Sequence, residues 1–421
     1  MKNYVDNLMN TDPEQKAFNS NIDFEYILIP TVKETKQFFG PITSEERTWR
    51  DKMYFDALLK SPRSKLGIGE HDRAEAYIFG NGIFPDVDSD AHKNHFPVSV
   101  KVMRIEELFI PPGETVDLTA HPGEFPWDTG DSEIYLHLTV KRLILSRQSR
   151  LVVNGNVFIL NCEEAVAHDL NGGYAIIELG TSDFIQQLSF PRLRPVDEAL
   201  KPEINGVNGA DGFCLNVEST PLGLRVIDGG ESHHGSDGTD GRNGLKGGNG
   251  RNGAMLFLSD LRFGRFSGFK ANSIHLKACA GTGFPGSDGS QGGNGGNGGN
   301  GADGLSTPFG IAKGFAGGSG GNGGNGGNGG RGGSGGMSCD IFLSLPFQSA
   351  YFFQAVTSCS SGGNGGKGGA GGKGGYAGLH GDLYENEGSA EVQNGKNGHQ
   401  GFAGADGRTR EAPKIHIYER K

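Results

Sequence analysis

The chain has 421 residues, of which 35% are hydrophobic and 74 are glycine, and its formal net charge is -10. This acidic balance, without any cluster of lysine and arginine, argues against nucleic-acid binding, which needs a positive surface for the phosphates. No stretch approaches the roughly 18 apolar residues of a membrane-spanning helix, and the first residues lack the apolar core of a secretory signal.

Glycine is concentrated after residue 205, whereas the preceding residues have an ordinary globular composition. We therefore expect a mainly β protein with three parts. These are a helical N-terminal segment over residues 1–73, a β-rich body over 74–204 and a glycine-rich region over 205–421.

The clearest helix is predicted over residues 43–60, because Thr43 and Glu46 have the spacing of a capping box. From about residue 74 the apolar period changes to two, which indicates strands. The predicted strands cover residues 76–84, 98–110, 134–146, 150–160 and 174–179.

Four stretches resemble one another, each an apolar strand, a short break and a second strand: residues 99–121, 136–162, 255–279 and 340–359. This repetition predicts the stacked rungs of a β-solenoid, or β-helix. The last three end in Cys162, Cys279 and Cys359, so we expect these thiols to stack as a buried ladder.

Between the later stretches, glycine recurs at every third position, as in GGNGGNGGN. This period fits polyglycine II helices, which have three residues per turn and rise about 3.1 Å per residue. Runs of GGX should lie between other helices, and runs of GXX at an edge. The runs lead out of apolar strands and back into them, which predicts packed hairpins with turns near His233 and His234, over 309–315 and over 376–392. A flexible linker would not need so strict a phase, and collagen would need more proline.

These GGNGGNGG runs with aromatic tips resemble the polyglycine-sandwich adhesins at the tail-fibre tips of T-even-like phages, in which stacked polyglycine II helices present loops to a host receptor. The resemblance covers the last half of the chain. It implies that the turns between glycine runs bind a receptor. The strands between the runs and the large N-terminal part depart from the adhesin pattern, and polyglycine II arrays also occur in an insect antifreeze protein and in some enzymes.

The candidate binding residues follow from this arrangement. Aromatic side chains amid glycine have little local core to enter, so they pack on a neighbouring glycine layer or serve as anchors at the tips. The binding set comprises Phe309, Phe315, Tyr376 and Tyr384, together with His233 and His234 of a polar tip.

Metal binding is a weaker hypothesis. Asp86, Asp88 and Asp90 alternate and His92 follows them, which suggests a cation site. The run lacks the glycine and glutamate of an EF-hand, so a solvated acidic turn is the alternative. Adjacent histidines with carboxylates around residue 233 could also bind a divalent cation, and the alternative there is a polar tip exposed for recognition. No cofactor is expected.

A polysaccharide lyase or hydrolase would need carboxylates and bases on adjacent rungs of one groove. Charged residues do recur at comparable places in three stretches: Glu106, Glu107, Lys141, Arg142, Arg262 and Arg265. The preferred prediction is nevertheless a non-enzymatic recognition protein, an adhesin or a toxin acting on gut cells. Its partner would be a host cell-surface receptor, a protein or a glycan. It would act outside the cell, after non-classical release or as part of a particle, and an oligomer stays open.

Overall fold

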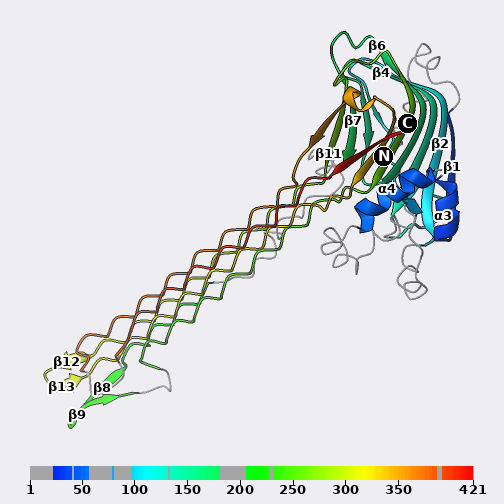
Figure 1. Ribbon diagram of the computed structural model, residues 1–421. Coiled ribbons are helices and arrows are strands. Elements are labelled where there is room, and N and C mark those ends of the chain that lie inside the picture. Colours follow the sequence, from blue (N-terminus) through cyan, green and yellow to red (C-terminus); the bar gives the residue numbers. More distant parts are fainter. Residues whose placement is uncertain are drawn as a thin grey trace, which may run out of the picture.

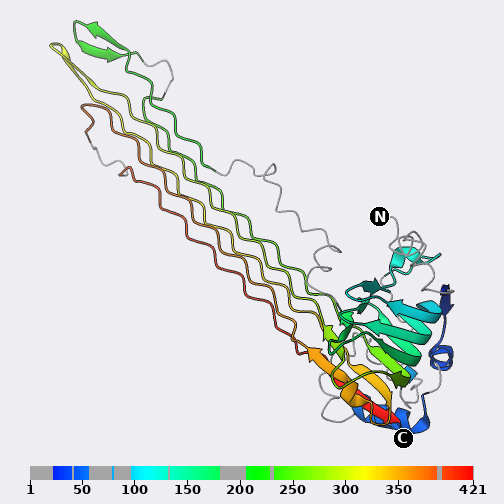
Figure 2. The ribbon, with the colours of Figure 1, turned by 90° about the horizontal axis from the view of Figure 1, so that it is seen from above.

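The computed structural model describes residues 22–39, 42–55, 78–79, 96–130, 133–180, 205–227, 232–385 and 391–420. In it the chain forms a broad β-sheet body at one end and a long, thin, glycine-rich shaft at the other (Figure 1). The view turned by 90° shows the same narrow shaft, with small hairpins at its far end (Figure 2). The predicted mainly β class is confirmed.

Two sheets build the described part of the body. The seven-stranded sheet contains, in spatial order, β1 (Ile22–Ile29), β2 (Val98–Ile110), β4 (Ile134–Ser146), β6 (Val157–His168), β10 (Ser259–Ser267), β14 (Ile341–Pro346) and β16 (Ile415–Arg420). The five-stranded sheet contains β15 (Phe353–Thr357), β11 (Ile274–Cys279), β7 (Ala175–Gly180), β5 (Arg150–Val153) and β3 (Thr115–Asp117). All pairings are parallel except that of β1 with β2.

The main hydrophobic core contains residues of both sheets. Leu138 of β4, Leu160 of β6 and Leu261 of β10 lie in register across the first sheet, and all are fully buried in one cluster with Ile177 of β7. The opposite face of the first sheet is also buried, in a second cluster. Burial on both faces explains why these parallel strands have nearly continuous apolar sequences. Short 3₁₀ turns occur at η2 (Pro122–Glu124) and η4 (Ala350–Phe352).

The N-terminal part covers that second face with α3 (Val32–Phe38) and α4 (Ser44–Phe55). Thr43 caps α4 as predicted, since the Glu46 amide donates to its hydroxyl at 3.2 Å. The segment is not purely helical, however, because β1 adds to the sheet edge. The strand predicted over 76–84 is not supported either. Within it, the described residues Ile78 and Phe79 are helical and buried.

The predicted cysteine ladder is wrong. Cys162 lies on β6 in the first sheet, whereas Cys279 lies on β11 in the second, and Cys359 is exposed beyond β15. The stretch 136–162 contains β4, β5 and the start of β6, so Cys162 lies within β6. In the later stretches Cys279 is the last residue of β11 and Cys359 follows β15.

The thiols should therefore differ in reactivity. Burial raises the pKa of Cys162 to about 12, whereas Cys214 and Cys359 are exposed. Titration of the native protein with a disulfide reagent at pH 8 is expected to label the two exposed thiols within minutes and to leave Cys162 unmodified until the protein unfolds. Rapid native labelling of Cys162, located by peptide mass mapping, would contradict its burial.

The shaft consists, among the described residues, of six extended glycine-rich runs. We number them run 1 (205–213), run 2 (232–254), run 3 (281–304), run 4 (314–336), run 5 (360–382) and run 6 (391–410). Odd-numbered runs lead away from the body and even-numbered runs return to it (Figures 1 and 2). At the polyglycine II rise of about 3.1 Å per residue, each of runs 2 to 5 would span on the order of 70 Å, whereas run 1 is much shorter.

Backbone hydrogen bonds arrange the runs in two layers. Runs 1, 3 and 5 lie parallel in one layer, as shown by the bonds from Gly206 N to Asn294 O (2.6 Å) and from Gly295 N to Lys373 O (2.8 Å). Runs 2, 4 and 6 form the other layer in the same way. Antiparallel bonds such as that from Gly372 N to Gly324 O (2.8 Å) join the layers.

Glycine is required where the runs touch. A Cβ atom built on Gly326 would lie 2.0 Å from the carbonyl oxygen of Gly369, and one on Gly327 would lie 2.0 Å from that of Leu245. No side chain fits such an approach. The GGX runs 3 and 4 lie between other runs, as predicted, because both glycines of each triplet face a neighbour.

The third residue of each triplet has a role that the sequence analysis missed. The Lys396 amide donates to Asn322 Oδ1 (2.9 Å), and the Asn322 amide donates to Asp240 Oδ1 (2.6 Å). Side-chain oxygens of one run thus accept the third N–H of the next run in the same layer. Asn and Asp therefore bind the runs together, beyond keeping the surface hydrated.

Candidate functional site

The far end of the shaft carries two β-hairpins. One is formed by β8 (Val217–Thr220) and β9 (Gly223–Val226), and the other by β12 (Leu305–Thr307) and β13 (Gly310–Ala312). We call residues 217–227 and 305–312 the tip. The turn predicted over 309–315 thus lies at the far end. The apolar strand that precedes run 2, β9, thus belongs to the tip and not to the body.

The two hairpins share the sequence Ser-Thr-Pro-apolar-Gly, at residues 219–223 and 306–310. In both, the threonine hydroxyl donates to the glycine carbonyl, Thr220 to Gly223 at 2.8 Å and Thr307 to Gly310 at 3.2 Å. Both glycines have positive φ, 120° and 148°, which L-residues rarely adopt. The repeat therefore encodes the same turn twice, and comparing the glycine-flanked segments with one another would have revealed it.

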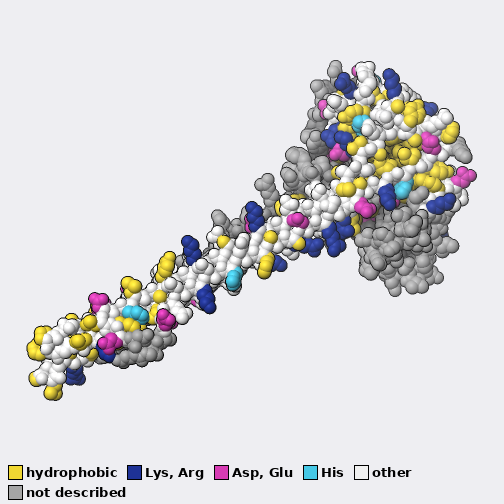
Figure 3. All heavy atoms as spheres, turned by 60° about the vertical axis from the view of Figure 1, so that its left-hand side comes forward, with side chains coloured by type: hydrophobic (Ala, Val, Ile, Leu, Met, Phe, Trp, Pro, Cys, Tyr) yellow, Lys and Arg dark blue, Asp and Glu magenta, His cyan; other side chains and the backbone are white. Residues whose placement is uncertain are grey.

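The hairpins lie against each other and expose their apolar apices. A Cβ atom on Gly223 would lie 3.6 Å from the Phe309 carbonyl oxygen, and one on Gly310 would lie 3.9 Å from Leu224 Cγ. Leu222 is fully exposed, and Phe309 and Ile311 are 66% and 69% exposed. Figure 3 shows hydrophobic side chains gathered at this end, whereas charged ones are scattered along the shaft. Leu222 and Ile311 were not among the predicted site residues.

Phe315, His233 and His234 lie together just behind the tip. The Phe315 ring centroid is 5.0 Å from each imidazole, and His233 is buried with its Nδ1 2.6 Å from the Phe213 carbonyl oxygen. Tyr384 stacks on His380 with 4.2 Å between ring centroids. Of the predicted set, these residues pack within the shaft end, and Phe309 is presented at the apex.

Tyr376 lies apart, on the side of run 5. Its backbone N–H donates to Asn297 Oδ1 at 2.9 Å, while its ring is 73% exposed. Phe402 occupies a comparable place on run 6 and is 79% exposed. Among the described residues, runs 5 and 6 are the last runs of their layers. No further run in the layer offers an amide to the side chain of Tyr376 or Phe402, so these positions can be aromatic.

The metal candidates gain no support. Asp86, Asp88, Asp90 and His92 lie outside the described residues. Across the residues that the structure does describe, no group of three or more His, Cys, Asp or Glu side chains is arranged to hold a metal ion.

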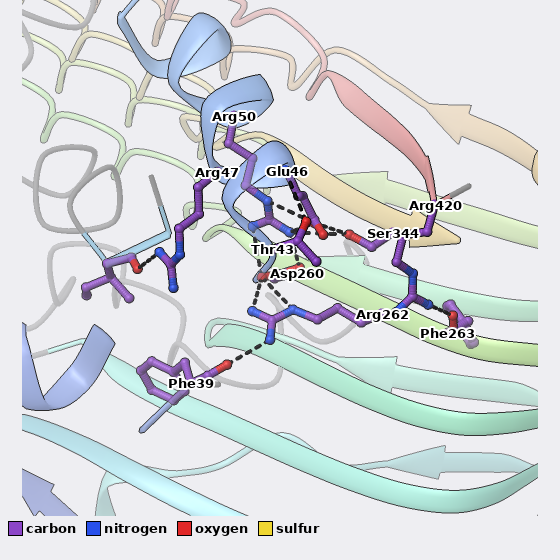
Figure 4. Close-up of polar contacts among 11 residues, drawn as sticks. Phe39, Thr43, Glu46, Arg47, Arg50, Asp260, Arg262, Phe263, Ser344 and Arg420 are labelled. Atoms are coloured by element: carbon purple, nitrogen blue, oxygen red, sulfur yellow. Dashed lines mark hydrogen bonds and ion pairs between the residues drawn. The ribbon is translucent and has the colours of Figure 1, made fainter. Parts of the chain in front are cut away.

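The body contains a buried network of charged side chains between α4 and the first sheet (Figure 4). Arg50 of α4 holds both oxygens of Asp260 on β10, at 3.0 and 2.9 Å, and also Glu46 at 2.7 Å. Arg262 donates to Asp260 at 2.6 Å and to the Phe39 carbonyl at 2.7 Å. Ser344 donates to Glu46.

This network joins the helices to the sheet. Burial alone would raise the pKa of Asp260, but the adjacent charges of Arg262 and Arg50 outweigh it and hold the pKa well below its usual value. The Asp260 carboxylate stays ionised, fully buried and bonded to two guanidinium groups. Such a group has neither access to a substrate nor a free lone pair aimed at one, so its role is structural.

The charged residues of the enzymatic hypothesis all lie on strands of the first sheet, and Arg262 of β10 belongs to the buried network. Lys141 pairs with Glu106 at 2.7 Å, Arg142 with Glu107 at 2.5 Å and Arg265 with Glu164 at 2.8 Å. They border an open hollow of about 380 Å³, lined by Lys141, Arg142, Glu163, Gly264 and Arg265. Each of these three bases thus forms an ion pair with a carboxylate on the same sheet.

Comparisons with known proteins assign no family. No family model and no curated protein matches the chain. Among solved structures, the chain is similar to a springtail antifreeze protein from Granisotoma rainieri, described as a nine polyproline type II helical bundle, with 30% identity over 34% of this chain and 94% of that one. The TM-score is 0.06, so the two structures do not share a superposable fold. Chains with glycine at every third position agree at those positions whatever their origin.

Proposed function

We propose that this chain is a non-enzymatic recognition protein that attaches to a cell surface through the tip. The observation that carries the proposal is the exposure of Leu222, Phe309 and Ile311 side by side at the far end of the shaft. Soluble proteins rarely expose clustered apolar side chains without a binding role. The tip also lies far from the body, where it can reach a surface without steric obstruction.

The shaft is suited to hold such a tip rigidly. We interpret it as a polyglycine II array and the two-sheet body as a β-solenoid, which is the arrangement expected from the period of three and from the repeated strands. Each run is bonded to neighbours along its length, so the tip cannot fold back on the body. The resemblance to phage tail-tip adhesins supports the same use of the turns.

Binding of fluorescently labelled protein to bacterial cells and insect gut membrane vesicles tests the proposal. The double variant Leu222→Ser with Phe309→Ser is expected to bind at least about tenfold more weakly than wild type, because buried apolar anchors dominate binding energy. The matched control is Leu245→Ser with Phe402→Ser, which removes a leucine and a phenylalanine from the shaft, 57% and 79% exposed, and should bind like wild type.

Equal loss in the tip and shaft variants, or no saturable binding to any cell or vesicle, would refute the proposal. A toxin acting on gut cells would attach through the same tip and then kill the cells. Viability of the bound cells, scored in the same experiment, separates a toxin from an adhesin.

A further inference from the structure

We infer that the tip binds a zwitterionic phospholipid bilayer by inserting its two hairpin apices between the headgroups. This inference rests on the proposed attachment through the tip and names its partner. Three features of the described residues support it: the kinds of apolar side chain at the apex, the hydrogen bonding of its backbone, and the distribution of charge around it.

The apex side chains favour lipid over a protein partner. Leu222, Phe309 and Ile311 are the most exposed side chains there, and Val226 and Leu305 are each 40% exposed. Protein–protein hot spots are enriched in Trp, Tyr and Arg, whose polar groups find partners, and leucine is under-represented. Leu222, Phe309 and Ile311 are aliphatic and phenyl groups without hydrogen-bonding atoms, which matches the acyl boundary of a membrane. The two turns also expose the hydroxyl side chains of Ser219 and Ser306.

Hydrogen bonds within each hairpin reduce the number of polar groups that would need water at the apex. Both hairpins pair their own strands, so the N–H and C=O groups that face the partner strand are satisfied without water. Thr220 and Thr307 turn their hydroxyl groups inward to glycine carbonyls, and the prolines that follow them have no N–H. The turns therefore expose apolar side chains, and their threonine hydroxyls are hydrogen-bonded within the turn.

The charges around the apex match a zwitterionic surface. Residues 219–224 and 305–312 contain no charged side chain. At the next level Glu218 lies opposite Arg225 across the hairpin, Lys313 pairs with Glu385 at 2.9 Å, and Asp303 and Asp382 add exposed carboxylates. Because this level has no excess of cationic side chains, it gives no preference for anionic lipid, and its two signs of charge fit headgroups that carry both phosphate and a cationic amine.

No helix among the described residues has the length and apolar character to cross a bilayer. The insertion inferred here is shallow and involves the two turns alone.

The test uses the full-length protein and large unilamellar phosphatidylcholine vesicles. Phe309→Trp is expected to show a blue-shifted emission and strong quenching by lipids brominated on the acyl chain, relative to wild type with Trp49 and Trp127 in the body. Phe402→Trp on the shaft, at a residue that is 79% exposed, is the matched control and should show neither change. Flotation should show that Leu222→Ser with Phe309→Ser lowers vesicle binding at least tenfold, and that neither 0.5 M salt nor added phosphatidylserine strengthens or weakens wild-type binding twofold.

Three other outcomes would overturn the lipid inference, and they differ in what they leave of the proposed function. Binding to cells through the tip without binding to protein-free vesicles would overturn the lipid inference and leave the proposed function intact, with a protein or glycan receptor as partner. Vesicle binding that the serine variant retains, or that depends strongly on phosphatidylserine, would also overturn it. Failure to bind either cells or vesicles would refute both proposals.

Discussion

Asp260→Asn is expected to lower the free energy of unfolding of the body by about 3–5 kcal/mol, the usual cost of removing one partner from a buried ion pair. Asp260 is completely buried and bonded to Arg50 and Arg262. Asparagine keeps the size of the side chain but removes its charge, so two buried guanidinium groups are left with the single carboxylate of Glu46.

Chemical denaturation followed by tryptophan fluorescence measures this effect. Trp49 of α4 packs 5.4 Å from the Tyr418 ring and 6.1 Å from that of Phe342, so its emission reports on the docking of the helix to the sheet. The control is Glu25→Gln, which removes an ion pair with Arg104 whose side chains are both 48% exposed. It should cost less than about 1 kcal/mol. A loss at Asp260 as small as that of the control would show that the network does not hold α4 in place.

Gly247→Ala is expected to destabilise the shaft by about 2–4 kcal/mol, as overpacking by a methyl group does where the backbone must move. A Cβ atom at this position would lie 2.0 Å from the Ser287 carbonyl oxygen and 2.8 Å from the Gly330 nitrogen. Runs 2, 3 and 4 would have to separate locally to admit it.

The adjacent residue provides the matched control. A Cβ atom on Gly248 would meet only the Ser287 hydroxyl oxygen, at 3.8 Å, so Gly248→Ala should be nearly neutral. Hydrogen–deuterium exchange detects the difference, because the amides of Ser287 and Gly330 should exchange much faster in the first variant than in the second. Similar exchange in both variants would argue against close backbone packing at this point.

The local signals in the sequence specified much of the fold. The strands predicted over 98–110 and 134–146 have these same bounds in the structure, because alternation and apolar runs depend on neighbouring residues alone. The start of α4 at Ser44 follows in the same way from the cap at Thr43. Phe309 was correctly expected at a tip, because it lies in a short non-glycine interruption between two glycine runs.

Other features depended on which segments meet. Cys162 and Cys279 end similar-looking stretches but lie in different sheets. The first stretch extends through β4 and β5 into β6 of the first sheet, whereas the second contains only β10 and β11 and ends in the second sheet. His233, His234 and Phe315 were assigned to turns, with packing on a glycine layer as the alternative for Phe315. In the structure both imidazoles contact the Phe315 ring behind the tip while His234 stays exposed, which only the pairing of runs 2 and 4 decides. Leu222 was missed, although it occupies the same place as Phe309 in the repeated Ser-Thr-Pro-apolar-Gly motif.

The sequence by itself determined the period of three, the apolar strands and the turns, since each of these is a property of a few neighbouring residues. The tertiary structure decided what the third residues of the glycine runs do. Asn322 accepts an amide from run 6, whereas Tyr376 at the end of its layer has no such task. It also placed residues 219–223 beside 306–310, and so created an apolar tip from two turns that are far apart in the chain. Contacts of this kind depend on the packing of whole runs, which no local pattern specifies.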